Sequence, residues 1–163
     1  QNGNGSISLQ GNLSVSGNLD ISGYARLSSL VVGGNAEFGG NVTVDGTLNI
    51  KRLTIAGHFT TTGEVPRIEL LAVNPPLVTI DGNDTSGTIK IVTGSEVVAA
   101  GDLVKAIFNG TYDKKPWLFI NAANLESANV QLYRDVNTGY FIIKLVSPLD
   151  SNKTYEFDYF IVQ

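Results

Sequence analysis

The first part of the chain alternates apolar and polar side chains in units of six. From Gly5 the units read GSISLQ, GNLSVS, GNLDIS, GYARL, SSLVVG, GNAEFG, GNVTVD, GTLNIK and RLTIAG. In most units the first, third and fifth positions hold Gly or apolar residues, and the others hold mostly Asn, Ser, Thr or Asp. Alternation with a period of two predicts β-strand with one buried face, and it excludes a helix, which needs apolar residues three and four apart.

The face expected to be buried changes parity once. Apolar residues lie at odd positions up to Leu27 and at even positions from Leu30, after a unit that is one residue short. Because a slip of one residue turns every side chain to the other face, we expect a bulge, bend or corner near Ser28 and Ser29. The residues expected to form an assembly surface are Leu13, Val15, Leu19, Ile21, Leu30, Val32, Phe38, Val42, Val44, Leu48 and Ile50.

A Gly at nearly every sixth residue lets short strands turn corners around an axis. Two architectures use such corners: a single-chain β-solenoid, and a triangular β-prism wound from three chains. A lone solenoid of residues 5–57 has about three rungs and a height of about 14 Å, with open edges at both ends, whereas three intertwined chains give a stalk of about 40 Å. Both need further copies. A meander of hairpins is disfavoured because NG and DG turns are not the repeated element.

The second part of the chain has a different composition. Residues 1–64 contain 12 of the 18 Gly and none of the five Pro. We therefore expect a repeat segment at 1–64 and an antiparallel β-sandwich, jelly-roll-like, at 65–163, so that the fold class is all-β. The expected strands are 67–73, 77–80, 88–93, 103–108, 117–121, 130–134, 140–146 and 155–162. In the last strand the alternation points Tyr155, Phe157, Tyr159 and Ile161 to one face and Glu156, Asp158, Phe160 and Val162 to the other. Phe160 and Val162 interrupt this otherwise polar face, which marks them as interface candidates.

Composition and charge exclude several function classes. The chain has no Cys, one His and a net charge of −4, which disfavours thiolate or multi-histidine metal sites, nucleic-acid binding and attraction to anionic membranes. No apolar run is long enough for a membrane span. His58 has no catalytic partner in any motif and is expected to be a junction residue. We expect no catalytic, cofactor or metal site, and hence no enzyme.

Two local features are compatible either with binding a ligand or with a purely structural role. The turn DGND at residues 81–84 offers oxygen ligands for Ca²⁺ but lacks the acidic spacing of an EF-hand, so we favour a self-stabilised Asx turn. Tyr112, Trp117, Tyr133 and Tyr140 are suited to a carbohydrate platform, but in a β-domain of this size we favour core or interface anchors.

Arrays of GNLxVx units resemble those of bacterial surface and appendage proteins and of phage tail-fibre proteins, where they lead into a small β-domain. The resemblance continues in GNDTSGTIKIVTG at 82–94, AGDLVKAIF at 100–108 and TYEFDYFIV at 154–162. The repeat is also weakly similar to that of bactofilins, which lack a β-domain of this size. The resemblance implies a structural role and no catalytic signature.

The leading hypothesis is a structural subunit of an extracellular fibre or appendage that self-assembles, as a homotrimer or a homopolymer, through its repeat and sheet edges. The alternative is a trimeric fibre tip or phage receptor-binding protein that recognises a surface glycan. Both place the protein outside the cell, at a cell surface or on a virion. The start Gln1-Asn2 is neither an initiator Met nor a basic signal region, which is consistent with a removed leader and equally with any trimmed chain.

Overall fold

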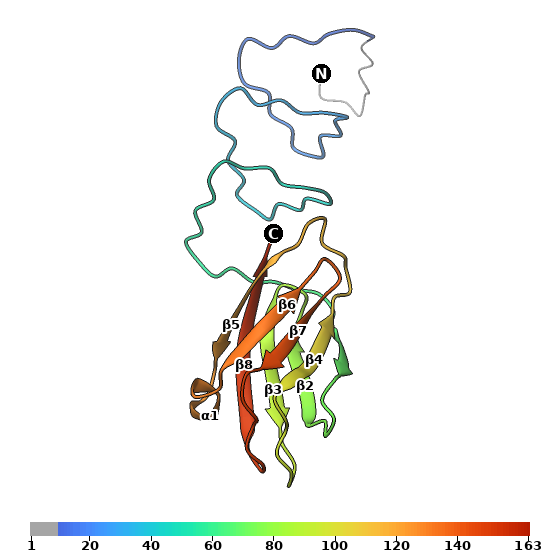
Figure 1. Ribbon diagram of the computed structural model, residues 1–163. Helices are drawn as coiled ribbons and strands as arrows, with labels where there is room; N and C mark the ends of the chain where they lie inside the picture. Colours follow the sequence, from blue (N-terminus) through green and yellow to red (C-terminus); the bar gives the residue numbers. More distant parts are fainter. Residues whose placement is uncertain (1–9) are drawn as a thin grey trace. The chain divides into compact units, whose positions relative to one another are not determined.

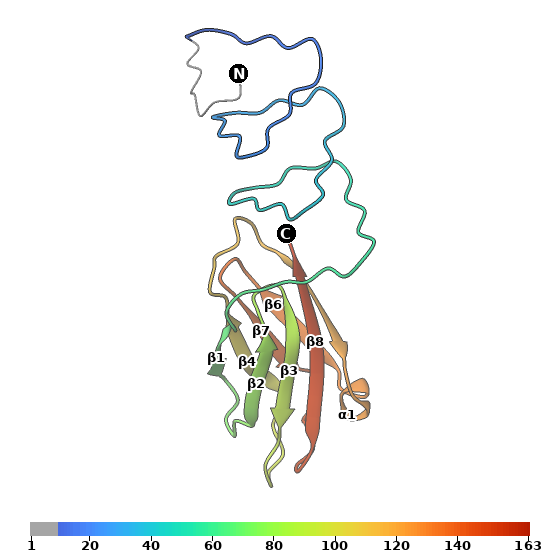
Figure 2. The same cartoon turned by 180° about the vertical axis from the view of Figure 1, so that it is seen from behind.

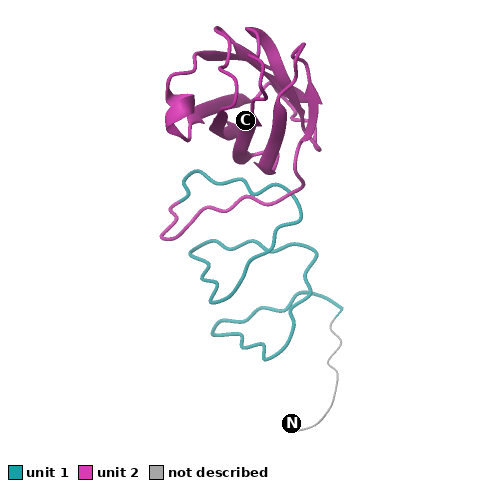
Figure 3. Ribbon diagram, turned by 90° about the horizontal axis from the view of Figure 1, so that it is seen from below, with its two compact units in different colours: residues 1–53 teal, residues 54–163 magenta. Residues whose placement is uncertain are grey.

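The computed structural model describes residues 10–163 (Figure 1). The chain divides into two compact units, Gln1–Leu53 and Thr54–Gln163 (Figure 3). This boundary lies upstream of the one expected from composition, after residue 64. One reason is that Thr61 is already tied to the second unit: its hydroxyl oxygen lies 2.6 Å from Ser86 Oγ and accepts a hydrogen bond from Asn83 Nδ2 at 3.0 Å.

The described part of the repeat, from residue 10 on, forms no strand in a single chain. Residues 10–66 contain no ladder, and residues 10–63 take part in no backbone–backbone hydrogen bond within the described part of the chain. The segment instead runs extended between regularly spaced bends and winds through successive loops (Figure 1). The bends lie at residues 10–11, 16–17, 22–23, 28, 33–34, 39–40, 45–46, 51 and 56–57. Units of six are therefore the straight sides of a winding chain.

The alternation of the repeat continues through two irregular bends. One lies at Ser28, where the sequence pattern predicts a change of parity, and on its two sides Tyr24 and Val31, at outward positions, are 98% and 92% exposed. A second lies at Lys51, which is also a bend of a single residue, and the next bend starts at residue 56, five residues later instead of six. The pattern did record it, because the apolar positions move from Ile50 back to odd numbers at Leu53, but sequence analysis missed this signal.

The second unit consists of two four-stranded antiparallel sheets, a β-sandwich-like arrangement (Figures 1 and 2). One sheet has the strand order β1-β4-β7-β6 and the other β2-β3-β8-β5. The bounds are β1 Arg67–Leu70, β2 Leu77–Gly82, β3 Ser86–Val92, β4 Gly101–Ile107, β5 Trp117–Ala122, β6 Leu132–Val136, β7 Tyr140–Leu145 and β8 Thr154–Val162. All eight predicted strands overlap these, and the all-β prediction is confirmed.

Alternation along the strands places the core between the sheets. In β8, Tyr155, Phe157, Tyr159 and Ile161 are buried, as the sequence predicts, and the residues between them face outward. From the other sheet, Phe141 of β7 packs against Tyr159 with ring centroids 5.6 Å apart. The core therefore joins both sheets through side chains that each strand contributes at every second position.

A short helix that the sequence did not announce connects the two sheets. The helix α1, Leu125–Ala128, follows β5 and is capped by Asn124, whose Oδ1 accepts hydrogen bonds from Ser127 N and Ser127 Oγ. The buried Ser127 hydroxyl in turn accepts from Glu156 N of β8 at 2.7 Å. Four residues are too few for a periodic signal, so this element is decided by side-chain hydrogen bonds. No helix in residues 10–163 is long and apolar enough to cross a membrane.

Two glycines close the turn between β2 and β3. Gly82 has φ +144°, and a Cβ there would lie 2.3 Å from the Ser86 carbonyl oxygen. A Cβ on Gly87 would lie 2.4 Å from the Asp81 carbonyl oxygen and 2.9 Å from the ring of Tyr159. Because backbone atoms cannot move aside as a flexible side chain can, these positions require glycine.

We expect Gly87→Ala to destabilise the second unit by about 2 kcal/mol or more, since the added methyl overlaps backbone and a buried ring. Urea unfolding followed by Trp117 fluorescence measures the change in the free energy of unfolding. Gly94→Ala is the matched control, because a Cβ at Gly94 has nothing within 4 Å. Equal unfolding free energies for the two variants would contradict this account of the turn.

Candidate functional site

The apolar face of the repeat is the largest candidate surface. The eleven residues expected to form an assembly surface are all exposed in the single chain, with exposed fractions between 45% and 68%. They continue past the second irregular bend as Leu53 and Ile55. The early part of the face, Ile7 and Leu9, lies outside the described residues. A stripe of this length is well beyond the scattered exposed apolar residues of ordinary monomer surfaces.

The glycines of the repeat have open space around them. At Gly11, Gly17, Gly23 and Gly46 an added Cβ would meet nothing within 4 Å, and the same holds for the other repeat glycines within the described residues, up to Gly57. In a single chain, therefore, no neighbouring backbone makes the close approach that glycine permits. Within the described part of one chain, the apolar residues of the repeat are therefore not covered, and its glycines do not contact a neighbouring backbone.

The two interface candidates of the last strand lie on an exposed apolar corner of the second unit. Phe160 and Val162 face outward from β8, and the adjacent β5 places Phe119 opposite Phe160 and Trp117 opposite Val162. Sequence analysis identified Phe160 and Val162 but did not predict that Phe119 and Trp117 lie beside them. The pairing of β5 with β8, which are separated by two strands and a helix in the chain, is a tertiary fact that no local pattern records.

The four aromatic residues considered as a carbohydrate platform are not gathered together. Tyr112 is half-buried: its ring packs edge-on to Phe108 at 5.0 Å and its hydroxyl donates to the Asp84 carbonyl oxygen at 2.9 Å. Tyr140 is half-buried as well, with Lys105 Nζ 4.7 Å from its ring centroid. Trp117 and Tyr133 are exposed, so the core role is wrong for these two.

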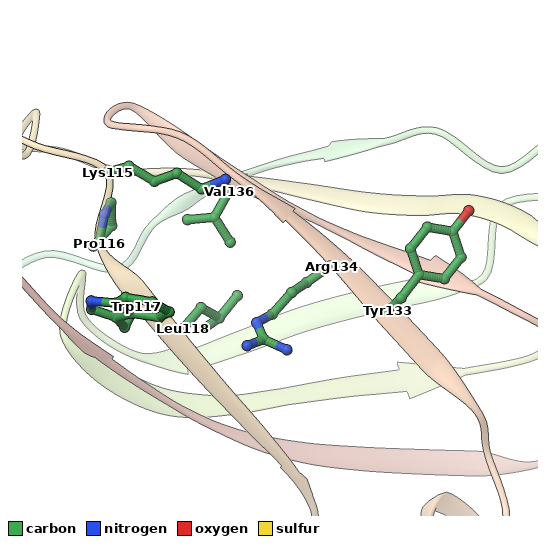
Figure 4. A pocket seen from close by; sticks show the side chains of 7 residues that line it. All are labelled: Lys115, Pro116, Trp117, Leu118, Tyr133, Arg134 and Val136. Carbon is green, nitrogen blue, oxygen red and sulfur yellow. The ribbon is translucent and has the colours of Figure 1, made fainter.

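A hollow of about 280 Å³ opens between the edge strands β5 and β6, lined by Lys115, Pro116, Trp117, Leu118, Tyr133, Arg134 and Val136. Arg134 lies opposite the buried Ile143 in the β6–β7 register, so it occupies a core-facing position of an edge strand. Figure 4 shows its guanidinium between the two strands, with the Tyr133 ring turned away from Trp117. A charge at such a position is one means of blocking edge-to-edge pairing.

Cations near this hollow form no ion pair with any carboxylate of the described residues 10–163. The second unit contains eight Lys and Arg, and Lys90, Lys105, Lys144 and Lys153 form salt bridges at 2.8–3.3 Å. Of the other four, Lys115 and Arg134 line the hollow and Lys114 precedes it in the chain. This is the part of the second unit best suited to contact an anionic group.

The acidic turn at residues 81–84 is occupied by its own hydrogen bonds. Asn83 Oδ1 accepts from Thr85 N at 2.8 Å and from Ser86 N at 3.1 Å, which confirms the Asx turn. Asp84 accepts from Asn109 N and Gly110 N at 3.0 and 2.8 Å. The described residues hold no group of three or more His, Asp or Glu suited to a metal ion. His58 is exposed in the segment that precedes β1.

Comparison of the chain with protein-family models, with curated proteins and with solved structures found no match. The resemblance to surface, appendage and tail-fibre proteins therefore stays a prediction from the sequence.

The buried Tyr159 gives the second unit a defined response to alkaline pH. Its hydroxyl donates to the Asn83 carbonyl oxygen, and burial, reinforced by Asp84, raises the pKa of Tyr159 well above its ordinary value. A group whose pKa is raised in the folded state contributes stability below its unfolded pKa, about 10 for Tyr, and loses it as the pH rises further. We expect unfolding free energy to fall above about pH 10.

Tyr159→Phe is expected to cost about 1 kcal/mol at neutral pH, from the lost hydrogen bond, and to show a smaller loss of stability above about pH 10. Urea titrations at several pH values measure both effects. Tyr24→Phe is the control, because the ring of Tyr24 is almost fully exposed. An identical alkaline decline in wild type and Tyr159→Phe would contradict the assignment of the decline to Tyr159.

Proposed function

We propose that this chain is a non-enzymatic structural subunit of an extracellular fibre or appendage, in which three copies wind their repeats into a β-prism stalk that carries the β-sandwich-like units. The observation that carries the proposal is the repeat itself: it bends at nearly every sixth residue, yet residues 10–63 make no backbone pairing with one another.

The spacing of strands supports three chains over one. In a single-chain solenoid successive rungs pair at about 4.8 Å, and a ladder within the chain is the result. When three chains share the ladder, each chain must advance by three strand spacings per turn, about 14 Å, and its own turns no longer pair. A single chain taken from such a trimer would therefore wind in the same way but have no backbone pairing between its own turns.

The net charge of the repeat does not oppose the association of three copies. Residues 1–53 contain three cations and three anions, so their net charge is zero, and the net charge of −4 belongs to the second unit. Three neutral repeats can therefore approach closely, while three acidic units remain mutually repelling and soluble. Burying the apolar faces in a shared interior contributes about 25 cal/mol for each Å² removed from water.

A homopolymer is the other form of the same proposal. The sheets end in the edge strands β1 and β6, and β2 and β5, and an alternating segment such as residues 6–21 is suited to add to such an edge in a neighbouring copy. Residues 6–9 of that segment lie outside the described residues.

Light scattering coupled to size-exclusion chromatography separates the two forms. We expect one species of about 52 kDa, three times the chain mass of 17.4 kDa, whose mass does not change with concentration. A concentration-dependent series of larger masses would favour the polymer. A homogeneous monomer at micromolar concentration would overturn both forms of the proposal.

A matched pair of adjacent variants tests the role of the apolar face. Val42→Asp places a carboxylate at an inward position in all three copies and is expected to cost at least about 3 kcal/mol per chain in the assembly, so that the protein becomes monomeric. Thr43→Asp places the same carboxylate at the neighbouring outward position and should leave the mass unchanged. Equal masses for the two variants would contradict burial of this face.

Recognition of a surface glycan is a second candidate function. The observation in its favour is the hollow between β5 and β6, which is lined by Lys115, Arg134 and the exposed Trp117. Neither cation forms a salt bridge with a carboxylate in the part of the chain that the structure describes. An acidic glycan is the chemistry that two cations and an aromatic ring would recognise.

Binding of acidic oligosaccharides, measured by calorimetry, is expected to be lost in Arg134→Gln and kept in Arg67→Gln. Arg67 is the matched control because it lies on the opposite edge strand of the same sheet and also forms no salt bridge within the described residues. Absence of heat with the wild-type protein, or equal heat with both variants, would remove this candidate.

A further inference from the structure

The outward face of the sheet β2-β3-β8-β5 carries an apolar cluster at its β5 edge. Trp117 and Phe119 of β5 lie opposite Val162 and Phe160 of β8, so the four side chains adjoin across the two strands. Their exposed fractions lie between 37% and 70%, the highest being that of Trp117. We refer to these four residues as the corner patch.

Much of the remaining outward surface of the two sheets is polar and internally paired, although single apolar residues such as Leu77 are also exposed. On the same face, Thr88 Oγ1 donates to Asp158 at 2.6 Å and Lys90 pairs with Glu156 at 3.3 Å. On the other sheet, Lys105 pairs with Glu69 at 2.9 Å and Lys144 with Asp102 at 3.0 Å. These paired polar side chains are suited to a surface that faces water. In the corner patch, Phe119, Phe160 and Val162 have no hydrogen-bonding side-chain atom, and the indole N–H of Trp117 forms no hydrogen bond within the described residues. This is the composition of a covered surface.

The corner patch lies at the end of the second unit where the chain enters it. Phe160 is paired with Ser86 in the β3–β8 register, and the Ser86 hydroxyl lies 2.6 Å from that of Thr61. The last bend of the repeat is at residues 56–57, only four residues before Thr61. Four residues of extended chain span at most about 14 Å. Whatever holds the repeats of several copies together therefore also holds the patch-bearing ends of those copies together.

We propose that in the assembled trimer each corner patch is covered by the corresponding end of a neighbouring copy. The proposal rests on the proposed function, because the repeat supplies the neighbours. Tethering within so short a distance makes the second contact effectively intramolecular, at concentrations of the order of mM, so a modest apolar patch is sufficient. Under threefold symmetry three identical patches can meet around one axis and close the interface without open ends.

Trp117 reports on the patch directly, because it is the only Trp in the chain. In the assembled wild-type protein its fluorescence is expected to be blue-shifted from that of the urea-unfolded chain, and its acrylamide quenching constant several-fold lower. In folded, monomeric Val42→Asp protein, the quenching constant is expected to return to that of an exposed Trp. Comparison with the monomeric Val42→Asp protein shows whether Trp117 is shielded by a neighbouring copy or by its own chain.

A second matched pair tests the patch without touching the reporter. Phe160→Ser and Leu77→Ser each replace an exposed outward apolar residue of the same sheet, but Leu77 lies on the opposite edge strand. In the trimer, Phe160→Ser is expected to raise the quenching of Trp117 several-fold and to lower the midpoint of thermal dissociation, and Leu77→Ser to change neither. Val162→Ser serves in place of Phe160→Ser if the latter fails to fold by circular dichroism.

The outcomes distinguish this inference from the proposed function. A mass of about 52 kDa with Trp117 as readily quenched as in the unfolded chain overturns the covered patch and leaves the trimeric stalk in place. Equal protection of Trp117 in the trimer and in monomeric Val42→Asp protein overturns it too. A wild-type protein that is monomeric at all concentrations overturns the proposed function, and the inference with it.

Discussion

The structure of this molecule depends on one constraint: in the part that the structure describes, the backbone N–H and C=O groups of its repeat segment form no hydrogen bonds with one another within a single chain. Residues 10–63 have the side-chain alternation of strands and the regular corners of a winding sheet, but no ladder joins them to one another. A strand with an apolar face is stable only when its backbone groups are paired and its face is covered. Within one copy of the repeat neither condition is met, and this is the physical reason for expecting further copies.

The second unit solves the same problem internally. Its eight strands pair in two antiparallel sheets, and side chains such as Phe141, Phe157 and Ile89 are fully buried between them. Several of its polar outward positions, such as Lys90, Lys105 and Lys144, form local ion pairs. The chain thus joins a self-sufficient folding unit to a segment that is incomplete alone. This division of labour suits a fibre subunit, in which one part assembles and the other remains a stable module.

Much of the second unit was predictable because its signals are local. Period-two alternation located all eight strands, and the parity of β8 correctly separated Tyr155, Phe157, Tyr159 and Ile161 from the outward residues. The Asx turn at Asn83 was predictable for the same reason, since its hydrogen bonds reach only two and three residues along the chain. The helix α1 was missed because four residues carry no period and its cap depends on Asn124.

The sequence by itself determined the period and most of the bends of the repeat and predicted its apolar face, since these follow from side-chain alternation and glycine spacing along the chain. It also identified Phe160 and Val162 as departures from a polar face. Only the tertiary structure decided that Trp117 and Phe119 adjoin them, that Arg134 occupies a core-facing position at an open edge, and that Thr61 belongs to the second unit. Strand order and register depend on contacts between residues far apart in the chain, and local alternation contains no information about which strands become neighbours.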